Sequence, residues 1–258
     1  MNKVMAGNDE YALLAECYDS LYAWRLEDVV FYLEESRAGQ GPILEAGCGT
    51  GRITLPLAEL HPGCHAMDLS PAMLAVLERK LRARPDLGVH LHCGDFRTFH
   101  LDTPFRQILM PFRGLLHLPD QESQLQALRN LRRHLAPEGR LVLDVFAPSY
   151  KILSSDGPGS FDLPEVAWGD GRILRCSDTL QFDHARQYIH VERRMRLVST
   201  QGETEERVTA MTLRYVFRFE MELLLKAAGF QVEEVYGGFD RRPYDYHSGE
   251  MIFMARAS

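Results

Sequence analysis

The sequence predicts an α/β fold: a doubly wound, mainly parallel sheet of seven strands with an antiparallel β insertion. From residue 42 to residue 147, short apolar segments alternate with segments of helical period, which is typical of parallel strands joined by helices on both faces of a sheet. The first strand ends in a turn with three glycines, as in the nucleotide-type sites of such sheets. From about residue 172 to 217 there is no helical period, which favours an antiparallel meander.

The first half of the chain supplies two N-terminal helices and five strands. Apolar residues recur at helical spacing in two runs within residues 10–38. Strands are predicted over residues 42–46, 64–69, 89–93, 107–112 and 140–146. Helices are predicted over residues 52–60, 72–84 and 120–135. Ser70 is expected to cap the second of these helices, because Pro71 suits a first helical turn.

The second half supplies the insertion and the end of the sheet. Three antiparallel strands are predicted near residues 172–180, 187–199 and 206–217, after a turn-rich mobile loop over 154–160. A helix over 220–228 ends at Gly229, the residue type favoured just beyond a helix. Strands over 231–236 and 251–256 are expected to form a hairpin that closes the sheet.

The composition indicates one large globular domain. The chain has 258 residues, 45% hydrophobic and 25% charged, and five cysteines without a C-x-x-C pair, which indicates reduced thiols. The net charge of −7 argues against nucleic acid as a partner and against an anionic membrane surface. No segment reaches the ~20 apolar residues of a membrane span. The first eleven residues lack the apolar core of a signal peptide, so we expect a cytoplasmic protein.

The residues around the glycine turn indicate which ligand it holds. A dinucleotide-binding turn, G-x-G-x-x-G, would place its third glycine where this chain has Arg52. Glu45 lies two residues before the first glycine, where a carboxylate repels a pyrophosphate and suits a cationic ligand. S-adenosylmethionine carries an ammonium and a sulfonium and has no phosphate. The E-x-G-x-G-x-G pattern therefore favours this cofactor over NAD, and a glycine-rich turn without a ligand is the alternative.

Two aspartates follow the next strands. Asp68 ends the second strand, where a carboxylate can accept hydrogen bonds from both hydroxyls of a ribose, and a helix cap is the alternative. Asp95 follows the third strand, where it can accept a hydrogen bond from an adenine amino group beside the ring of Phe96. The alternative for Asp95 is an ordinary turn residue.

Five segments together resemble one family. They are LEAGCGTGRITLPLA, MDLSPAML, CGDFRTF, LRNLRRHLAPEGRLVLDVFAPS and LRYVFRFEMELLLKAAGF. In this order they resemble the class I S-adenosylmethionine-dependent methyltransferases, and more narrowly the bacterial small-molecule enzymes with an N-terminal YDxLY segment and a β insert over the pocket. The resemblance covers about residues 10–256. It implies the Rossmann-like methyltransferase fold, with S-adenosyl-L-methionine as cofactor and S-adenosyl-L-homocysteine as product.

The resemblance also implies site residues and domains. The cofactor contacts it implies come from the N-terminal helix, the glycine turn and the ends of three strands: Tyr11, Tyr18, Glu45, Ala46, Gly47, Cys48, Gly49, Gly51, Asp68, Leu69, Met73, Asp95, Phe96, Pro111 and Phe112. Candidate pocket residues, with packing as the alternative, are Tyr22, Tyr150, Tyr215 and Tyr246. We expect a helical cap over 1–40, a cofactor-binding core over 41–150 and 218–258, and a lid over the substrate pocket at 151–217.

Arg113 departs from the family pattern after the fourth strand. An arginine near a sulfonium requires an anionic partner, for which we expect either Glu45 or an anionic group of the substrate. Residues 172–218 also hold nine arginines against six acidic residues, which points the same way. A solvated arginine face on an exposed meander is the alternative.

His117 is the candidate for the substrate side of the site. It follows the fourth strand, and an unperturbed histidine, with a pKa near ~6.5, can take a proton from a hydroxyl or an ammonium. The alternative is a histidine that orients the loop or the substrate. His90 and His92 form an H-x-H pair without a further ligand at metal spacing, so we expect no metal.

These observations predict transfer of a methyl group from S-adenosylmethionine to nitrogen or oxygen of a small-molecule substrate, with an anionic group on that substrate left open. The alternatives are a methyltransferase acting on nucleic acid or protein, an NAD-dependent oxidoreductase, and a cofactor-binding protein without turnover. We expect a monomer or a homodimer.

Overall fold

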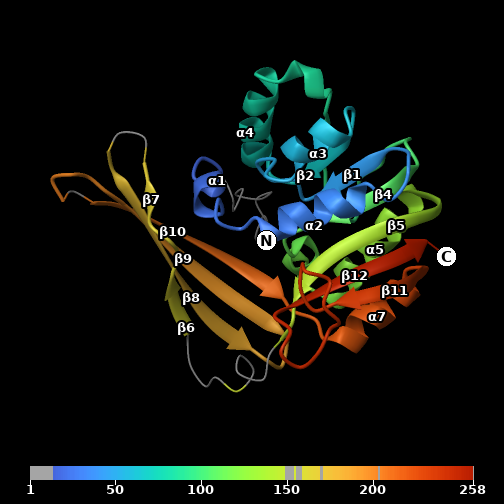
Figure 1. Cartoon of the computed structure of the whole chain (residues 1–258). Coiled ribbons are helices and arrows are strands. Elements are labelled where there is room, and N and C mark those ends of the chain that lie inside the picture. Colours follow the sequence, from blue (N-terminus) through green and yellow to red (C-terminus); the bar gives the residue numbers. More distant parts are fainter. Residues whose placement is uncertain (1–13, 149–153, 155–158, 169–170, 203, 258) are drawn as a thin grey trace, which may run out of the picture.

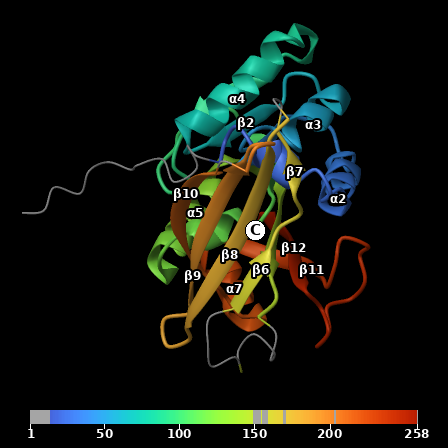
Figure 2. The same cartoon turned by 90° about the vertical axis from the view of Figure 1, so that its left-hand side faces the viewer.

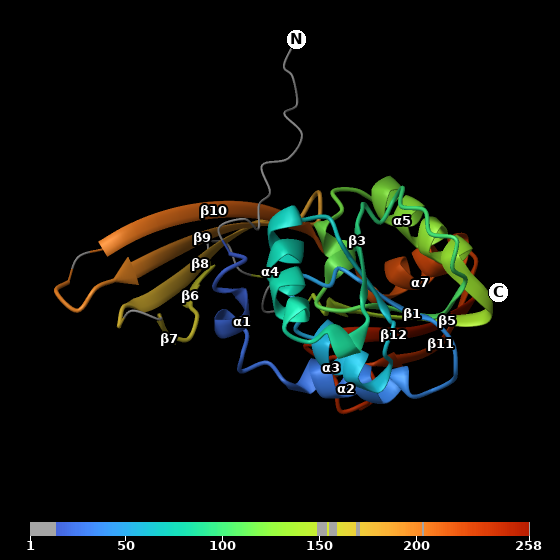
Figure 3. The same ribbon diagram turned by 90° about the horizontal axis from the view of Figure 1, so that it is seen from above.

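The computed structural model describes residues 14–148, 154, 159–168, 171–202 and 204–257. Within these ranges the chain forms a seven-stranded sheet covered by helices and a five-stranded antiparallel sheet that projects from it (Figure 1). Figure 2 shows the broad face of the projecting sheet. The short helix α1 (Tyr18–Leu21) lies between this sheet and α4 (Pro71–Arg82), as the view from above shows (Figure 3).

The seven-stranded sheet has the predicted doubly wound, mainly parallel arrangement. From one edge to the other its strands are β11 (Phe230–Tyr236), β12 (Glu250–Ala257), β5 (Leu135–Phe146), β4 (Phe105–Met110), β1 (Ile43–Ala46), β2 (His65–Asp68) and β3 (His90–Cys93). Strands β1 to β5 are parallel, and β12 is antiparallel to both of its neighbours, which confirms the closing hairpin. The carboxyl ends of β1 to β5 therefore meet at one edge, and the start of β12 joins them there.

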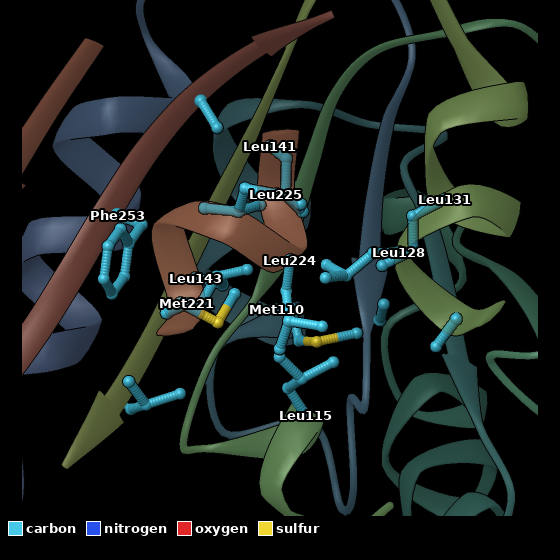
Figure 4. Packing of buried hydrophobic residues seen from close by; sticks show 14 of the residues in the cluster. Met110, Leu115, Leu128, Leu131, Leu141, Leu143, Met221, Leu224, Leu225 and Phe253 are labelled. Carbon is cyan, nitrogen blue, oxygen red and sulfur yellow. The ribbon is translucent and has the colours of Figure 1, made fainter. Parts of the chain in front are cut away.

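Helices cover both faces of this sheet (Figure 3). On one face lie α2 (Glu27–Ser36) and α3 (Thr54–Leu60), and on the other α5 (Gln121–His134) and α7 (Arg218–Ala227). Neighbouring residues of a strand point to opposite faces, so Ile43 packs with α2 and α3 while Leu44 packs with α5 and α7. Figure 4 shows the second of these cores, where Met221, Leu224 and Leu225 of α7 pack toward the sheet.

Two elements differ from the prediction by more than small shifts of their ends. Helix α1 is a single turn at Tyr18–Leu21, and β5 begins at Leu135, although Pro137 and Gly139 were expected to separate the preceding helix from a strand that starts at 140. The start of β5 pairs with β4 through a register shift, and Glu138 within it has φ +61°. A bulge tolerates these residue types because it interrupts the ladder, and pairing with β4 extends the strand beyond its local sequence signal.

The projecting sheet is built from the inserted segment. Its strands are β10 (Thr204–Arg214), β9 (Tyr188–Val198), β8 (Ile173–Asp183) and β6 (Gly159–Asp162), and β7 (Val166–Ala167) also pairs with β8. The predicted three-stranded meander is confirmed. The loop predicted over 154–160 is wrong at its end, because Gly159 and Ser160 already pair with β8; residues 155–158 lie outside the described residues.

None of the described helices is long and apolar enough to cross a membrane. All five cysteines are free thiols, of which Cys93 is exposed and the others are buried. In the described part of the chain, no group of three or more histidine, cysteine and acidic side chains is arranged to hold a metal ion.

Candidate functional site

Three glycines shape the turn between β1 and α3. Gly47, Gly49 and Gly51 have φ of +87°, +54° and +88°, a region that side chains disfavour. A Cβ on Gly47 would press on the ring of Phe96 at 3.3 Å, and one on Gly51 would overlap Leu77. A Cβ on Gly49 would meet nothing within 4 Å. This side of the turn therefore borders open space in which a ligand can lie against the backbone.

Asp68 fixes the glycine turn to the end of β2. Its carboxylate accepts hydrogen bonds from the backbone N–H of Gly49 and from that of Ser70, each at 2.8 Å. The neighbouring Leu69 is 62% exposed despite its apolar side chain. Ser70 caps α4, as predicted, by accepting a hydrogen bond from Met73 N at 3.1 Å. A carboxylate and an exposed apolar side chain thus stand together beside the open side of the turn.

Asp95 is paired within the protein. Arg97 donates to its two carboxylate oxygens from Nε and Nη2, the latter at 2.6 Å, and these bonds hold the pKa of Asp95 below its ordinary value. The neighbouring ring of Phe96 lies between Gly47 and Gly114, close to both. An adenine amino group that bonds to Asp95 would share this carboxylate with Arg97.

Glu45 lies beneath the turn and not on its surface. Its side chain is 1% exposed, and Thr54 Oγ1 donates a hydrogen bond to Oε2 at 2.5 Å. Burial raises the pKa of Glu45 to about 8. In the ligand-free protein at neutral pH, Glu45 is therefore mainly a neutral acid that is bonded to Thr54 inside the protein.

The residues after β4 form a strained turn. Phe112 and Arg113 have φ of +55° and +64°, although neither is glycine. The carboxylate of Asp144, at the end of β5, accepts hydrogen bonds from Phe112 N at 2.8 Å and Arg113 N at 3.1 Å. Tyr32 donates its hydroxyl to the same carboxylate at 2.6 Å. Asp144 is 1% exposed, and burial together with the charge of Glu250 raises its pKa to about 6.

The expected pairing of Arg113 with Glu45 is wrong. Arg113 Nη2 bonds to Glu250 Oε1 at 2.7 Å, and its guanidinium lies 5.4 Å from the centre of the Phe146 ring. Arg25 Nη2 donates to the same oxygen of Glu250 at 2.9 Å. Glu250 reaches this place because β12 begins beside the end of β5, a pairing that the order of residues along the chain does not reveal.

A buried ion pair lies near the other side of Phe112. Arg52 donates to both oxygens of Asp28, at 2.7 and 2.5 Å, and to the carbonyl of Arg25 at 2.8 Å. The guanidinium groups of Arg25 and Arg52 lie 5.2 and 5.1 Å from the centre of the Phe112 ring. The arginine that replaces the third glycine of the dinucleotide pattern thus joins α2 to the glycine turn.

The segment around α1 is tied to the glycine turn. Thr50 Oγ1 donates a hydrogen bond to Asp19 at 2.7 Å. Lys80 of α4 pairs with Asp19 and donates to the carbonyl of Thr50 at 2.7 Å. The aspartate of the YDxLY segment therefore anchors α1 on the turn.

Tyr18 and Tyr22 lie against the strained turn. Their ring centres are 6.3 and 5.0 Å from that of Phe112. The hydroxyl of Tyr22 accepts a hydrogen bond from Arg193 of β9 at 2.9 Å, and Arg193 forms a buried ion pair with Asp178 of β8 at 2.6 Å. The two tyrosines thus connect the end of β4 to the projecting sheet.

His117 ends the short 3-10 helix η2 (Gly114–His117), which follows the strained turn. It is half-buried, and η2 packs against β10 and β5. Burial lowers the pKa of His117 to about 4, so the imidazole is neutral at pH 7. It is a weaker base than the unperturbed histidine that the sequence led us to expect.

The other predicted tyrosines do not form one group. Tyr215 is 2% exposed, belongs to the core and bonds to His184 Nδ1 at 3.0 Å, which favours the packing alternative. Tyr246 is 74% exposed on the loop before β12. Tyr11 and Tyr150 lie outside the described residues.

Most arginines of the projecting sheet and its edges have acidic partners. The pairs are Arg175–Glu165, Arg186–Asp183, Arg193–Asp178, Arg194–Glu206, Arg196–Glu206, Arg207–Glu205, Arg214–Glu220 and Arg218–Glu222. These pairs offset the excess of positive charge that suggested an anionic substrate. The structure thus favours the alternative reading, an arginine face that is balanced within the protein.

Comparison with known proteins agrees with this geometry. A family model described as a methyltransferase domain matches residues 43–139. The cypemycin N-terminal methyltransferase of a Streptomyces species is 31% identical over 215 residues, which are 81% of this chain and 80% of that protein. The chain belongs to the class I S-adenosylmethionine-dependent methyltransferases. A second relative is the dTDP-3-amino-3,6-dideoxy-α-D-glucopyranose N,N-dimethyltransferase of Streptomyces fradiae. The present methyltransferase is 27% identical to it, over 87% of this chain and 86% of that relative.

Solved structures share the whole fold of the methyltransferase, including the projecting sheet. The CcbJ methyltransferase of Streptomyces caelestis superposes with a TM-score of 0.79 at 25% identity, covering 97% of this chain and 98% of that one. The S-adenosylmethionine-bound CalS10 from Micromonospora echinaspora gives a TM-score of 0.70 at 23% identity, with both chains fully covered.

S-adenosyl-L-methionine is the cofactor of this methyltransferase, and the residues at the turn fit it. The open side of Gly49 leaves room for a ligand against the backbone. Asp68 offers carboxylate oxygens beside it, and a bound cation would favour the anionic form of the buried Glu45 on the protein side of the turn. A cationic ligand is favoured by such surroundings, whereas a pyrophosphate is not.

Sequence reasoning missed several residues at this edge of the sheet, namely Asp19, Asp28, Tyr32, Asp144 and Glu250. Two of them carried a signal, since Asp19 is the aspartate of the YDxLY segment and Asp144 is a lone carboxylate near the end of the apolar strand RLVLDVF. The others are ordinary polar positions in helices, turns or strand ends, and tertiary packing alone makes them part of the site.

Proposed function

We propose that this methyltransferase methylates the amine nitrogen of a small molecule, a class that includes short peptides and amino sugars. The observation that carries the proposal is the 31% identity to an enzyme named for N-terminal methylation, over 81% of this chain. A second relative over most of the chain is named an amino-sugar N,N-dimethyltransferase. Both matches, over 81% and 87% of this chain, extend well beyond the shared domain at 43–139.

The charges at this edge of the sheet are compatible with an amine. When bound, S-adenosyl-L-methionine supplies an electrophilic methyl group. Arg25 and Arg113 lie where β4, β5 and β12 meet, but Glu250 pairs with both of them and Asp144 lies beside them, so no net positive charge repels an ammonium there. An amine must lose its proton before it can react, which happens in solution or on entry to the site.

We assign His117 an orienting role. Its pKa of about 4 keeps the imidazole neutral, so a ring nitrogen can accept a hydrogen bond from an N–H of the acceptor. The same low pKa makes His117 a weak general base. Correct placement of the amine supplies most of the rate enhancement in an in-line methyl transfer.

The cap and lid also belong to the proposal. Residues 1–40 would cover the cofactor, since Asp19 is bonded to Thr50 of the glycine turn. Residues 151–217 would cover the acceptor, since Arg193 of β9 reaches Tyr22 beside Phe112. Enclosure by these segments would exclude water from a small acceptor.

An anionic group on the acceptor is not part of the proposal. Arg113, which suggested it, already bonds to Glu250 at 2.7 Å. An O-methyltransferase is the second candidate, because a malonyl-[acyl-carrier protein] O-methyltransferase of Bacillus cereus is 33% identical. That match covers only 40% of this chain and 37% of that protein, so it supports the proposal less than the two longer matches do.

Paired acceptors test the proposal. The protein is incubated with S-adenosylmethionine and either a short peptide with a free N-terminus or a dTDP-linked 3-amino sugar, and release of S-adenosylhomocysteine and product mass are measured. N-acetylated forms of both compounds are the matched controls. We expect methylation of the free amines and none of the acetylated forms. Methylation of a hydroxyl in the acetylated forms, with the free amines left unmodified, would contradict the proposal.

A further inference from the structure

We propose that Asp144 is a positioning residue of the methyl-transfer site, which acts by holding the Phe112–Arg113 turn in its strained conformation. The inference rests on the proposed function, because that function requires the Phe112–Arg113 turn to lie at the reacting end of the cofactor. Asp144 itself touches neither cofactor nor acceptor in this view, and its effect passes through the backbone of the turn.

The turn needs an external restraint. Phe112 and Arg113 are consecutive residues with positive φ, and neither has the conformational freedom of glycine or the local hydrogen bonding of asparagine. Such conformations persist where surrounding contacts over-determine them, and they gather at functional sites. Within the described residues, the only other non-glycine positions with positive φ are the isolated Glu138, Gln187 and Arg241.

Asp144 supplies the restraint through both carboxylate oxygens. Oδ1 accepts the N–H of Phe112 at 2.8 Å and the hydroxyl of Tyr32 at 2.6 Å, and Oδ2 accepts the N–H of Arg113 at 3.1 Å. Tyr32 is fully buried on α2, and Asp144 is 1% exposed at the end of β5. One carboxylate thus ties the turn to a strand and to a helix on the other side of it, in a place shielded from water.

The turn places a ring that several site residues contact. Tyr18 and Tyr22 pack against Phe112, and the guanidinium groups of Arg25 and Arg52 lie 5.2 and 5.1 Å from the centre of its ring. The backbone next leads into η2 and His117. A change in the conformation of the turn would therefore move the Phe112 ring and His117 together.

The competing explanation is a carboxylate that only stabilises the core. The two explanations differ in what protonation does. If Asp144 holds the turn as an anion, its protonation weakens both backbone bonds and releases the turn while the protein stays folded. The charged and titratable groups that face Asp144 are Tyr32 and Asp28 on α2, Glu250 on β12, Arg113 on the turn, and Arg25 before α2.

The amide protons of Phe112 and Arg113 report on these bonds without any acceptor. In nitrogen-15 relaxation-optimised spectra we expect both amide signals to lie downfield and to move upfield together as the pH falls, with a midpoint near 6, since burial raises the pKa of Asp144 to about 6. In Tyr32→Phe the midpoint should rise, because the lost hydrogen bond lowered that pKa. Amide signals that ignore pH from 8 to 5 in the wild type would overturn the proposal.

Substitution tests the functional consequence. In Asp144→Asn one oxygen remains and an NH2 group faces the N–H of Arg113, so we expect about fivefold weaker binding of S-adenosylmethionine in calorimetry. Turnover of the amine acceptor should fall by about 10- to 100-fold, mostly in kcat, as expected for a misplaced site. Tyr32→Phe keeps both backbone bonds but raises the pKa of Asp144, so its kcat should fall at neutral pH and recover as the pH rises; this pH profile, compared with that of the wild type, is the test if Asp144→Asn does not fold. A folded Asp144→Asn protein with wild-type affinity and kcat would overturn the proposal.

The two proposals fail separately. If no amine in the panel is methylated, the proposed function fails, but the amide titration and the cofactor affinity still decide the role of Asp144. If amines are methylated and the amide signals do not titrate, only the positioning role of Asp144 fails.

Discussion

At the scale of single residues, burial sets the charge of the groups in this site. Glu45 and Asp144 are acidic groups whose pKa burial raises, to about 8 and about 6, and His117 is a base whose pKa burial lowers, to about 4. All three shifts favour the neutral form, as expected for desolvated groups. A bound sulfonium would oppose this effect at the acids by favouring their anions.

His117 gives the first prediction at this scale. Its imidazole signals should titrate with a midpoint near 4 in a pH series of NMR spectra, and not near ~6.5. The unfolded chain binds a proton at this histidine below pH ~6.5 and the folded protein does not, so the wild type loses stability from this group as the pH falls from 6.5 toward 4. In His117→Gln the free energy of unfolding should fall less steeply over this pH range than in the wild type, by up to about 1.4 kcal/mol per pH unit. If urea unfolding gives the same pH dependence of the free energy of unfolding in the variant and the wild type, the lowered pKa of His117 is contradicted.

Glu45 gives the second, with the opposite slope. Between pH ~4.5 and about 8 the folded protein holds a proton on Glu45 that the unfolded chain does not, so this group makes the ligand-free protein less stable as the pH rises. Glu45→Gln keeps an oxygen for Thr54 and cannot ionise. From pH 5.5 to 7.5 we expect the variant to gain about 1–2 kcal/mol in free energy of unfolding relative to the wild type. Urea denaturation measures both proteins at both pH values. If the difference in free energy of unfolding between Glu45→Gln and the wild type is the same at pH 5.5 and pH 7.5, the raised pKa of Glu45 is ruled out.

At the scale of elements, the glycines of the turn meet two separate requirements, packing against α4 and space for the ligand, although the sequence shows them as one pattern. All three glycines have positive φ, but their surroundings differ, since Gly51 faces Leu77 of α4 and Gly49 faces open space. Gly51 therefore serves packing between the turn and α4, whereas Gly49 serves the ligand. The consensus spacing alone does not separate these two roles.

Alanine substitutions separate them. Gly51→Ala combines backbone strain with overlap on Leu77 and should lower the free energy of unfolding by about 2–4 kcal/mol. Gly49→Ala, the matched control, adds strain alone and should cost about 1–2 kcal/mol. Calorimetry should show the reverse order for the cofactor, with a loss of at least about tenfold for Gly49→Ala, because the methyl group enters the ligand space. The assignment fails if Gly49→Ala binds S-adenosylmethionine as the wild type does.

At the scale of the whole molecule, a buried ion pair between β8 and β9 of the projecting sheet holds the arginine that bonds to the rest of the protein. The side chains of Arg193 and Asp178 are 6% and 5% exposed, and Arg193 also donates to Tyr22 near α1. Most other ion pairs of this sheet are exposed, as for Arg207 and Glu205, which are 54% and 51% exposed. The buried pair therefore fixes the position of Arg193, through which the sheet bonds to Tyr22.

Removing one partner of each pair tests this difference. Asp178→Asn leaves a buried arginine without its counter-charge and should lower the free energy of unfolding by about 3–5 kcal/mol. Glu205→Gln, the exposed control, should change it by less than about 1 kcal/mol. Urea denaturation of the three proteins decides between these values. Similar small effects of both substitutions would show that the buried pair stabilises the protein no more than the exposed pair does.

The sequence by itself determined the order of strands and helices, the parallel sheet with its closing hairpin, the β insertion and the cofactor. These rest on local patterns: alternation of apolar segments, caps such as Ser70, and the E-x-G-x-G-x-G turn, each of which acts within a few residues. The start of β5 was mispredicted because pairing with β4 overrides the breakers Pro137 and Gly139.

Only the tertiary structure decided the charge partners. Glu250 lies 137 residues from Arg113 along the chain, and Asp144 lies 112 residues from Tyr32, so no periodicity connects them. They meet because the ends of β4 and β5 and the start of β12 share one edge of the sheet. Charges separated in this way come together through the topology of strands, and burial at that edge then fixes their protonation.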